Sequence, residues 1–533
     1  MDKVKRYALY LLVIAGCGGL LFDFGGTIIG PALPYIGPTD ENPGSLGLFT
    51  TAQVSHLSSA VVMCAALACL VAGWLTEKFG RKMMMLVSAA VAALACVPIC
   101  MTNGNYPMFF LGRAMQGVAA GFIGVVVPMY LAECLDANSR GKGAGMFQLL
   151  DFIGITFCSI VGLVVVHTIG AADDATVTAA RKSLAWKTIF WSSAVPAVLF
   201  FIGALGLKES PRWLYNKFVK NIRKASDLES VIREGEKLLS DKSFDATGVF
   251  AREKKIMCAC IRKAPAFKQA AVAALAANNG EAKAKEILAE MIAADEAEAA
   301  EKAALQAAAK GDTLFQRKYV LPFCISLAVL ICNQAIGFNA IQYFSIPMFM
   351  KAGLTQATAN AANFIVWLVP IPITALALWL VDRSGRKTLL KIGTFGMVVA
   401  LVGVATMFLF LEREMVTKGI FAGRATVVGI ALFVASFSVG PGVVVWLALS
   451  ELMPSRIRAN GMAIALFVNQ MVAFAIADAF LPWQKACGYA VVFYSLAFFA
   501  FLYFLTAAFL LPETKGKTLE QIEEYFKTGK MPG

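Results

Sequence analysis

The chain has 533 residues, of which 58% are hydrophobic and only 16% are charged. Its mean hydropathy of +0.68 is far above that of a soluble globular protein and excludes that class. The net charge of +13 does not call for a nucleic-acid partner, because an excess of Lys and Arg in the inner loops of a membrane protein accounts for it.

Twelve apolar stretches follow one another along the chain, each long enough for a helix to cross a hydrocarbon core of roughly 30 Å. They begin near Tyr7, Gln53, Met83, Tyr106, Lys142, Trp186, Lys318, Thr358, Thr388, Gly423, Ala459 and Gly488. The first has a basic start like that of a signal peptide, but it continues to about Tyr35 without a cleavage site. We therefore expect it to be retained as a span.

Positive charge falls on alternate loops. The basic residues concerned are Lys78, Arg81, Lys82, Arg140, Lys142, Arg383, Arg386, Lys387, Arg456 and Arg458. Because inner loops are enriched in Lys and Arg, we expect these loops and both termini to be cytoplasmic. The sequence thus predicts a multi-pass monomer in the lipid bilayer of the cell membrane.

Residues 208–317 interrupt the apolar pattern and divide six spans from six. We expect an N-terminal six-helix bundle at 1–207, a cytoplasmic linker at 208–317, a C-terminal six-helix bundle at 318–511 and a cytoplasmic tail at 512–533. The linker is rich in Ala, Glu and Lys, and Asn278-Asn279-Gly280 separates two expected helices. It has few large apolar residues for a core, so we interpret it as a solvated bridge, with a partner-docking module as the alternative.

The two halves repeat each other. Gly-Trp-Leu-Thr-Glu-Lys-Phe-Gly-Arg-Lys at 73–82 returns as Leu-Trp-Leu-Val-Asp-Arg-Ser-Gly-Arg-Lys at 378–387. Leu-Ala-Glu133 with Arg140 seven residues later returns as Leu-Ser-Glu451 with Arg458. With six spans in each copy, the halves are expected to be parallel and related by an axis along the membrane normal, with a substrate bound between them.

These motifs resemble the sugar porter family of the major facilitator superfamily. The resemblance rests on the Gly-Arg-Lys loops of both halves, on Lys208-Glu-Ser-Pro-Arg-Trp213 and on Pro512-Glu-Thr-Lys-Gly-Lys-Thr-Leu-Glu520. It covers nearly the whole chain except the Ala-rich insertion. It implies an all-α integral membrane protein of twelve helices in two parallel bundles, which rock about a central sugar site.

A sugar presents many hydroxyls and no charge, so a selective site needs amides and an aromatic face. The resemblance places Gln148, Gln334 and Trp446 in such a site, together with Asn333, Asn339, Asn469 and Gln470. Gly337 could break the helix there and free backbone groups to line the cavity. The alternative for each residue is an interhelical hydrogen bond or a packed aromatic ring. Pro370 and Gln470 depart from the family pattern, which indicates an altered pocket.

Ionisable residues inside a membrane cost about 2.5–3.5 kcal/mol each on insertion scales, so each needs a reason. In proton-coupled members of the family an aspartate of the first helix pairs with an arginine that matches Arg113, and the resemblance offers Asp23 for that role. The family position falls on Gly25, so Asp23 would need a local break at Gly25-Gly26. A structural ion pair with Arg113 is the alternative. Asp151 shares a helix face with Gln148 and is expected to be a pocket acid or a structural hydrogen-bonding group.

Charged residues at the inner helix ends resemble the family's cytoplasmic gate. They are Glu77, Arg81, Glu133, Arg140, Glu209, Arg212, Asp382, Arg386, Glu451, Arg458 and Glu513. Several such pairs could together hold the inner side closed, although the positive charges also serve orientation. Asp478 is expected in a solvated outer mouth, and His56 in interfacial packing without a ligand-spaced partner.

The chain shows no nucleotide loop, zinc signature or nucleophile elbow, so we expect no enzyme activity, no cofactor, no metal site and no catalytic residue. The prediction is a secondary transporter of a sugar or polyol that works by alternating access and is coupled to protons. Alternatives are a facilitative carrier, a carrier of another small and possibly cationic solute, and a non-transporting sensor that signals through residues 208–317.

Overall fold

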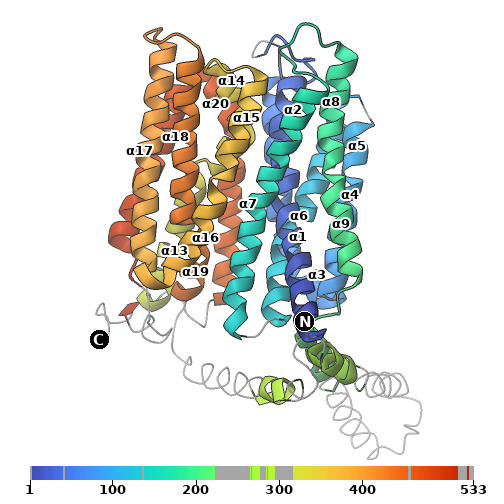
Figure 1. The fold of residues 1–533 in the computed structure, drawn as a ribbon. Helices are drawn as coiled ribbons and strands as arrows, with labels where there is room; N and C mark the ends of the chain where they lie inside the picture. The colour runs from blue at the N-terminus through green and yellow to red at the C-terminus, as the bar shows by residue number, and fades with distance from the viewer. Residues whose placement is uncertain are drawn as a thin grey trace, which may run out of the picture.

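The computed structural model describes residues 3–39, 42–101, 103–134, 137–222, 267–276, 286–293, 316–453, 458–513 and 525–526, with 265 and 284. Every regular element within these ranges is helical (Figure 1). In the first half the helices are α1 (Lys3–Thr27), α2 (Ile29–Ile36), α3 (Thr51–Phe79), α4 (Arg81–Leu94), α5 (Cys96–Cys100), α6 (Tyr106–Cys134), α7 (Ala137–Thr168), α8 (Ala179–Ser192) and α9 (Ala194–Leu205). The expectation of an all-α protein is confirmed.

The second half has a similar set of helices. They are α13 (Arg317–Ala335), α14 (Phe338–Lys351), α15 (Gln356–Leu368), α16 (Pro370–Ser384), α17 (Arg386–Glu412), α18 (Ile420–Val439), α19 (Pro441–Leu452), α20 (Arg458–Leu505) and the π-helical turn η1 (Thr506–Leu510). Several of them continue one another end to end, as α1 and α2 do, and α13 and α14.

Eleven stretches of the described helices are long and apolar enough to cross a membrane. The last, Ile464–Leu510, has 47 residues and would be about 70 Å long if it were straight. It is not straight, because Gly488 interrupts α20 with a φ of 84° and a ψ of 164°. The stretch therefore crosses twice, which accounts for the twelve expected spans.

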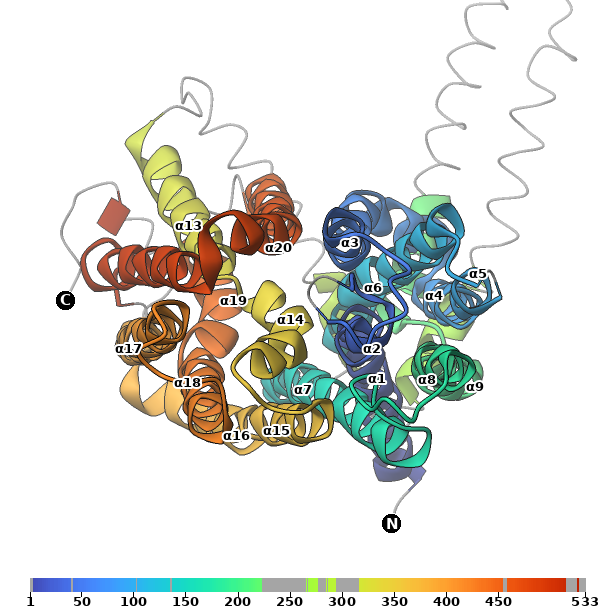
Figure 2. The ribbon, with the colours of Figure 1, turned by 90° about the horizontal axis from the view of Figure 1, so that it is seen from above.

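The helices form two bundles side by side, α1–α9 in one and α13–α20 in the other, as Figure 2 shows. Within a bundle, small residues let helices approach closely. A Cβ atom added to Gly117 of α6 would lie 2.4 Å from the Val61 carbonyl oxygen of α3. One added to Gly154 of α7 would lie 2.4 Å from the Leu20 oxygen of α1. Both contacts exclude any larger residue.

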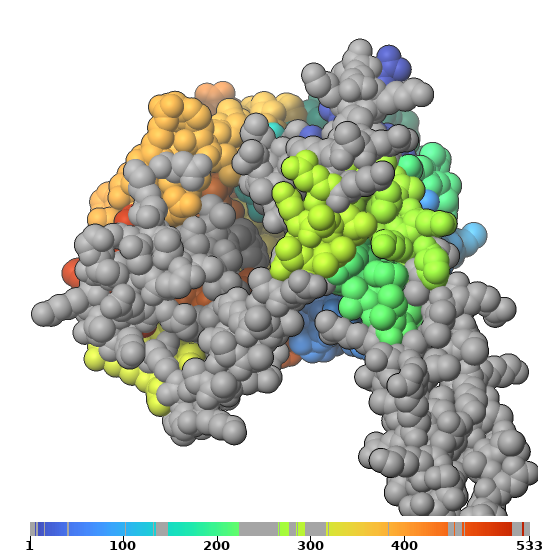
Figure 3. Space-filling view, turned by 90° about the horizontal axis from the view of Figure 1, so that it is seen from below, coloured from blue at the N-terminus to red at the C-terminus, as the bar shows by residue number. Residues whose placement is uncertain are grey.

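The start of α1 and the junctions α3–α4 and α16–α17 lie at one end of the molecule with residues 211–222, as Figure 1 shows. We call this the linker end, and the opposite end, with α2, α5 and the end of α14, the far end. At the linker end a small apolar cluster joins residues 211–222 to Phe267–Ala276 and 286–293 (Figure 3). Its buried members are Leu214, Tyr215, Ala271, Ala274, Leu275, Ala284 and Leu288. The expectation that this region lacks a core is wrong for these residues, since alanines provide much of it.

Candidate functional site

Two polar residues of α7 lie together in the first bundle. Gln148 Nε2 donates to Asp151 Oδ2 at 3.1 Å, which confirms that the two side chains share a helix face. Asp151 is only 6% exposed, and its Oδ1 has no hydrogen-bond partner among the described residues. Gln148 is half-buried. Since an unpaired buried carboxylate oxygen is costly, this position calls for a proton or a ligand donor.

The amide side chains of the second bundle lie near the break between α13 and α14. Gly337 lies in the left-handed region at φ 76° and ends α13, as its position in the sequence predicted. Just before it, Gln334 Nε2 donates to Asn469 Oδ1 of α20 at 3.3 Å, and Asn469 Nδ2 donates to the Leu330 carbonyl oxygen at 2.9 Å. Asn333 is 3% exposed, and its Oδ1 has no partner among the described residues.

Asn339 and Gln470 are half-buried beside this network, and Gln334 also keeps partial exposure. Polar side chains within membrane spans are expected to line an aqueous space or to pair with one another. Gln334 pairs with Asn469, which is fully buried, while Gln334 itself keeps partial exposure, so the interhelical bond is present and the ligand contact stays a prediction. The side chain of Trp446 lies outside the described residues, although its backbone belongs to α19.

Arg113 of α6 is fully buried, and it holds backbone carbonyls instead of a carboxylate. Its guanidinium donates to the carbonyl oxygens of Gly25 at 2.5 Å, Gly26 at 3.0 Å and Leu57 at 2.9 Å, and to Gln116 Oε1 at 2.7 Å. The last four carbonyls of a helix have no partner within it, and α1 ends at Thr27. Arg113 therefore caps the end of α1.

The expected direct pair between Asp23 and Arg113 is absent between these two described residues, and that part of the prediction is wrong. The helix is interrupted at Ile28, between α1 and α2, and not at Gly25-Gly26, and Ile28 itself has right-handed helical angles, so Asp23 keeps its helical direction. It faces Gln342 of α14 and lies near Asp151 and Tyr343. A Cβ atom on Gly25 would instead lie 3.5 Å from Gln116, next to the guanidinium. The two positions are about 200° apart around the helix, which explains the difference.

At the linker end, part of the expected charged cluster is assembled in the first bundle. Arg81 binds Glu133 through two hydrogen bonds, of 2.9 and 2.7 Å, and the two side chains are 6% and 11% exposed. Glu209 Oε1 accepts the backbone N–H of Arg81 at 2.8 Å and of Lys82 at 3.2 Å. Glu77 contributes only its carbonyl oxygen, to the Trp213 indole, and Arg212 is exposed.

The second bundle repeats part of this arrangement. Glu513 accepts the backbone N–H of Arg386 at 3.0 Å and of Lys387 at 3.1 Å. The side chains of Arg140, Asp382, Glu451 and Arg458 lie outside the described residues. These bonds join helices of the same bundle, so they show the internal repeat and leave the gating role a prediction.

At the far end, hydrogen bonds join the two bundles, and sequence reasoning missed them. Asp478 Oδ1 of α20 lies 2.7 Å from His56 Nδ1 and 2.7 Å from Ser59 Oγ of α3. Gln342 donates to Thr27 at 2.9 Å, and Asn363 to Ser159 at 3.0 Å. The outer, solvent-accessible positions expected for Asp478 and His56 agree with side chains that are 25% and 50% exposed, but their pairing was not predicted, because the partners are about 420 residues apart in sequence and meet only in the fold.

A family model described as "Sugar (and other) transporter" matches residues 11–247 and 265–526. The facilitated glucose transporter protein 1 of Caenorhabditis elegans is 29% identical over 86% of this chain and 77% of its own. The major myo-inositol transporter IolT of Bacillus subtilis is 26% identical over 97% of this chain and 94% of its own.

A solved structure, the inward-open xylose transporter XylE of E. coli, superposes with a TM-score of 0.71 at 21% identity. The superposition covers 97% of this chain and 99% of the XylE chain. It confirms the fold that the resemblance implied, two bundles of six helices.

Proposed function

Since the chain belongs to the sugar (and other) transporter family, we propose that it moves a sugar or polyol across a membrane by alternating access. The observation that carries this proposal is the pair of polar groups within the spans, Gln148 with Asp151 in one bundle and Gln334 with Asn469 in the other. Amides that donate and accept suit a ligand with many hydroxyls. The relatives named for glucose and myo-inositol support the same class of solute.

Alternating access is supported by where the two bundles are joined. Every hydrogen bond between described residues of different bundles lies from mid-depth to the far end, from Thr156–Trp367 to His56–Asp478. The linker-end bonds between described residues stay within one bundle. In this state the far end is held closed, and transport requires that these bonds break and form in turn.

Proton coupling is the second part of the proposal. Asp23 and Asp151 are deep in the first bundle and near each other, and Asp23 also faces Gln342 of the other bundle. Adding a proton removes the desolvation cost of a buried carboxylate and changes what Gln342 can bind. A proton gradient could therefore favour one of the two states.

The linker end is proposed to face the cytoplasm, because the basic loops Lys78–Lys82 and Arg383–Lys387 lie there. Both termini then lie on the cytoplasmic side of a cell membrane. We propose that the chain works as a monomer, with the substrate passing between its own two bundles.

The test is uptake by purified protein in proteoliposomes, with a panel of radiolabelled hexoses, pentoses and polyols, with and without an inward acid gradient. We expect uptake of at least one of them to rise with the gradient. Gln334→Ala should raise KM about tenfold or more, since a lost hydrogen bond to a ligand costs about 1–2 kcal/mol. Asn216→Ala, an exposed amide at the linker end, is the control. If the chain moves no solute, whether residues 223–264 are present or deleted, the result would favour the non-transporting sensor.

A second candidate, a cationic solute, is favoured by the unpaired Oδ1 of Asp151 beside Asp23. It predicts that D-glucosamine is taken up in preference to D-glucose. Preference for the neutral sugar would exclude it.

A further inference from the structure

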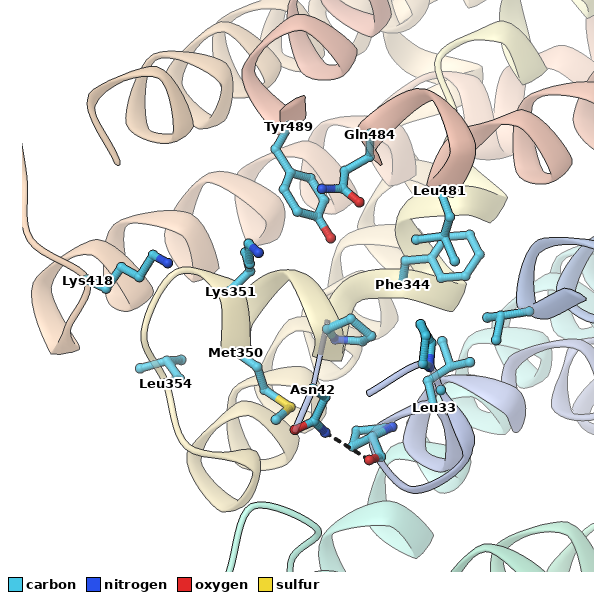
Figure 4. Close-up of a pocket in the computed structure, with 15 residues that line it drawn as sticks. Leu33, Asn42, Phe344, Met350, Lys351, Leu354, Lys418, Leu481, Gln484 and Tyr489 are labelled. Atoms are coloured by element: carbon cyan, nitrogen blue, oxygen red, sulfur yellow. Dashed lines mark hydrogen bonds between the residues drawn. The ribbon is translucent and has the colours of Figure 1, made fainter. Parts of the chain in front are cut away.

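A pocket of about 290 Å³ lies between the two bundles at the far end (Figure 4). Leu33 of α2 and Asn42 of the following loop come from the first bundle. Lys351 of α14, Lys418 of the loop before α18 and Gln484 of α20 come from the second. The pocket therefore exists only while the two bundles are together at this end.

The charge that the described residues bring to this pocket is positive. Lys351 and Lys418 are the only charged residues among the described residues that line it, and no Asp or Glu does. Figure 4 shows both lysines on one side of the pocket. Glu412 does not line the pocket, and its carboxylate accepts the backbone N–H of the lining residue Tyr489 at 2.7 Å. A concave site with two cations attracts a small anion.

Its polar and apolar walls suit a hydroxylated ring. The side-chain oxygen of Gln484 is buried and has no hydrogen-bond partner among the described residues, and such an atom costs about 1–3 kcal/mol unless a donor reaches it. Asn42 is fixed by its bond to the Pro34 carbonyl oxygen at 2.8 Å. Leu33, Phe344 and Leu481 form an apolar wall. The volume is at the low end for ligand sites and suits a monosaccharide.

We propose that this pocket binds a sugar acid, a monosaccharide-sized carboxylate, separately from the central site. The carboxylate pairs with Lys351 and Lys418, and a hydroxyl donates to Gln484 Oε1. Since both bundles form the walls, the ligand binds the state with a closed far end and stabilises it by mass action. The bound acid therefore slows transport without occupying the central site.

The test is binding to the full chain in nanodiscs, measured by calorimetry with D-glucuronate. D-glucuronamide, which has the same shape without the charge, is the matched ligand. We expect saturable binding of glucuronate and at least tenfold weaker binding of the amide. Lys351→Gln and Lys418→Gln should each weaken glucuronate at least tenfold. Lys485→Gln, which removes an exposed charge beside Gln484 but outside the pocket lining, should leave binding unchanged.

Further arms separate the two sites. Gln334→Ala should leave glucuronate binding unchanged, and glucuronate should lower the maximal rate of sugar uptake without raising KM. Lys418→Arg keeps the positive charge and should keep most of the affinity for glucuronate, which would show that the loss in Lys418→Gln is due to the charge and not to a folding defect. Equal binding of acid and amide, unchanged affinity in both lysine variants, or loss of binding in Gln334→Ala would each overturn the proposal. The binding readout does not depend on transport, so its failure is distinct from a failure of the proposed function.

Discussion

At the scale of single residues, the direction of a side chain around its helix decides its partners. Asp23 and Gly25 are two residues apart on α1, yet only the Gly25 position faces Arg113 and Gln116. Asp23 instead faces Gln342 on the other bundle, with Asp151 nearby. Because the Asp23 carboxylate faces the opposite bundle, a change in its protonation acts directly on the interface between the bundles, which must open during transport. This placement suits coupling without an ion pair to Arg113.

Asp23→Asn is expected to keep exchange of the transported sugar and to lose accumulation driven by a pH gradient. The amide imitates a permanently protonated acid, so the sugar site is preserved while the proton step is lost. Counterflow and gradient-driven uptake in proteoliposomes measure the two activities separately. The control is Asp174→Asn in the far-end loop, where the side chain accepts hydrogen bonds from the backbone N–H and the hydroxyl of Thr176. Accumulation that survives in Asp23→Asn would refute the coupling role.

Arg113→Gln is expected to destabilise the protein, because the shorter amide cannot reach the carbonyls of Gly25, Gly26 and Leu57 together. Each buried carbonyl left without a donor costs about 1–3 kcal/mol. The loss should appear as a lower midpoint of thermal unfolding of the protein in detergent. Arg181→Gln on the far-end surface is the control. An unchanged midpoint would show that these carbonyls find water instead.

At the scale of helices, Gly80 and Gly385 lie at the turns between consecutive helices. The carboxylates of Glu209 and Glu513 bind the N-termini of the helices that follow these turns. Gly80 and Gly385 have φ values of 99° and 85°, and each is followed by a helix whose first N–H groups point at a glutamate. A negative charge at a helix N-terminus is stabilising, by about 0.3–1 kcal/mol at an exposed site. The two halves therefore repeat a helix N-terminal cap as well as the Gly-Arg-Lys motif.

Much of the arrangement of the helices could be predicted from the sequence. Hydropathy predicted the spans, and Gly337 predicted the break that places Gln334 and Asn339. Hydropathy could not predict that Gln334 meets Asn469, because that contact depends on how α13 packs on α20. Likewise the cluster at Leu214 and Leu275 could not be predicted, since three of its seven buried members are alanines, which composition alone assigns to a solvated helix.

Glu209→Gln and Glu513→Gln are expected to lower the unfolding midpoint, each through its own bundle. Each substitution removes a charge that accepts backbone N–H groups, three at Glu209 and two at Glu513, and we expect about 1–2 kcal/mol from each. Because the two sites share no partner, their effects should add in the double variant. Glu77→Gln is the control, as that exposed side chain makes none of these contacts. Effects that do not add would mean that the two caps are coupled across the bundles.

At the scale of the whole molecule, the two bundles are joined by polar contacts at the far end and carry a pocket there. His56, Ser59 and Asp478 form a small latch between α3 and α20. Tyr106 is a further ionisable group near Asp478. His56 and Asp478 are 50% and 25% exposed, so solvent screens the pair and its strength is modest. A modest latch is suitable for a protein that must open repeatedly.

The latch predicts that the far end opens more readily when its bond to His56 is removed. His56→Ala removes the contact with Asp478 Oδ1 and leaves the bond from Ser59 Oγ in place. An exposed pair contributes up to about 1 kcal/mol, so the open population should rise at most about fivefold. Spin labels at Met101 and Met415, exposed far-end residues of opposite bundles, would measure the separation by pulsed electron resonance. His56→Gln, which can keep a hydrogen bond to Asp478, is the matched variant and should leave the separation close to that of the unchanged protein. An equal rise in both variants, or no rise in His56→Ala, would show that this pair does not hold the far end closed.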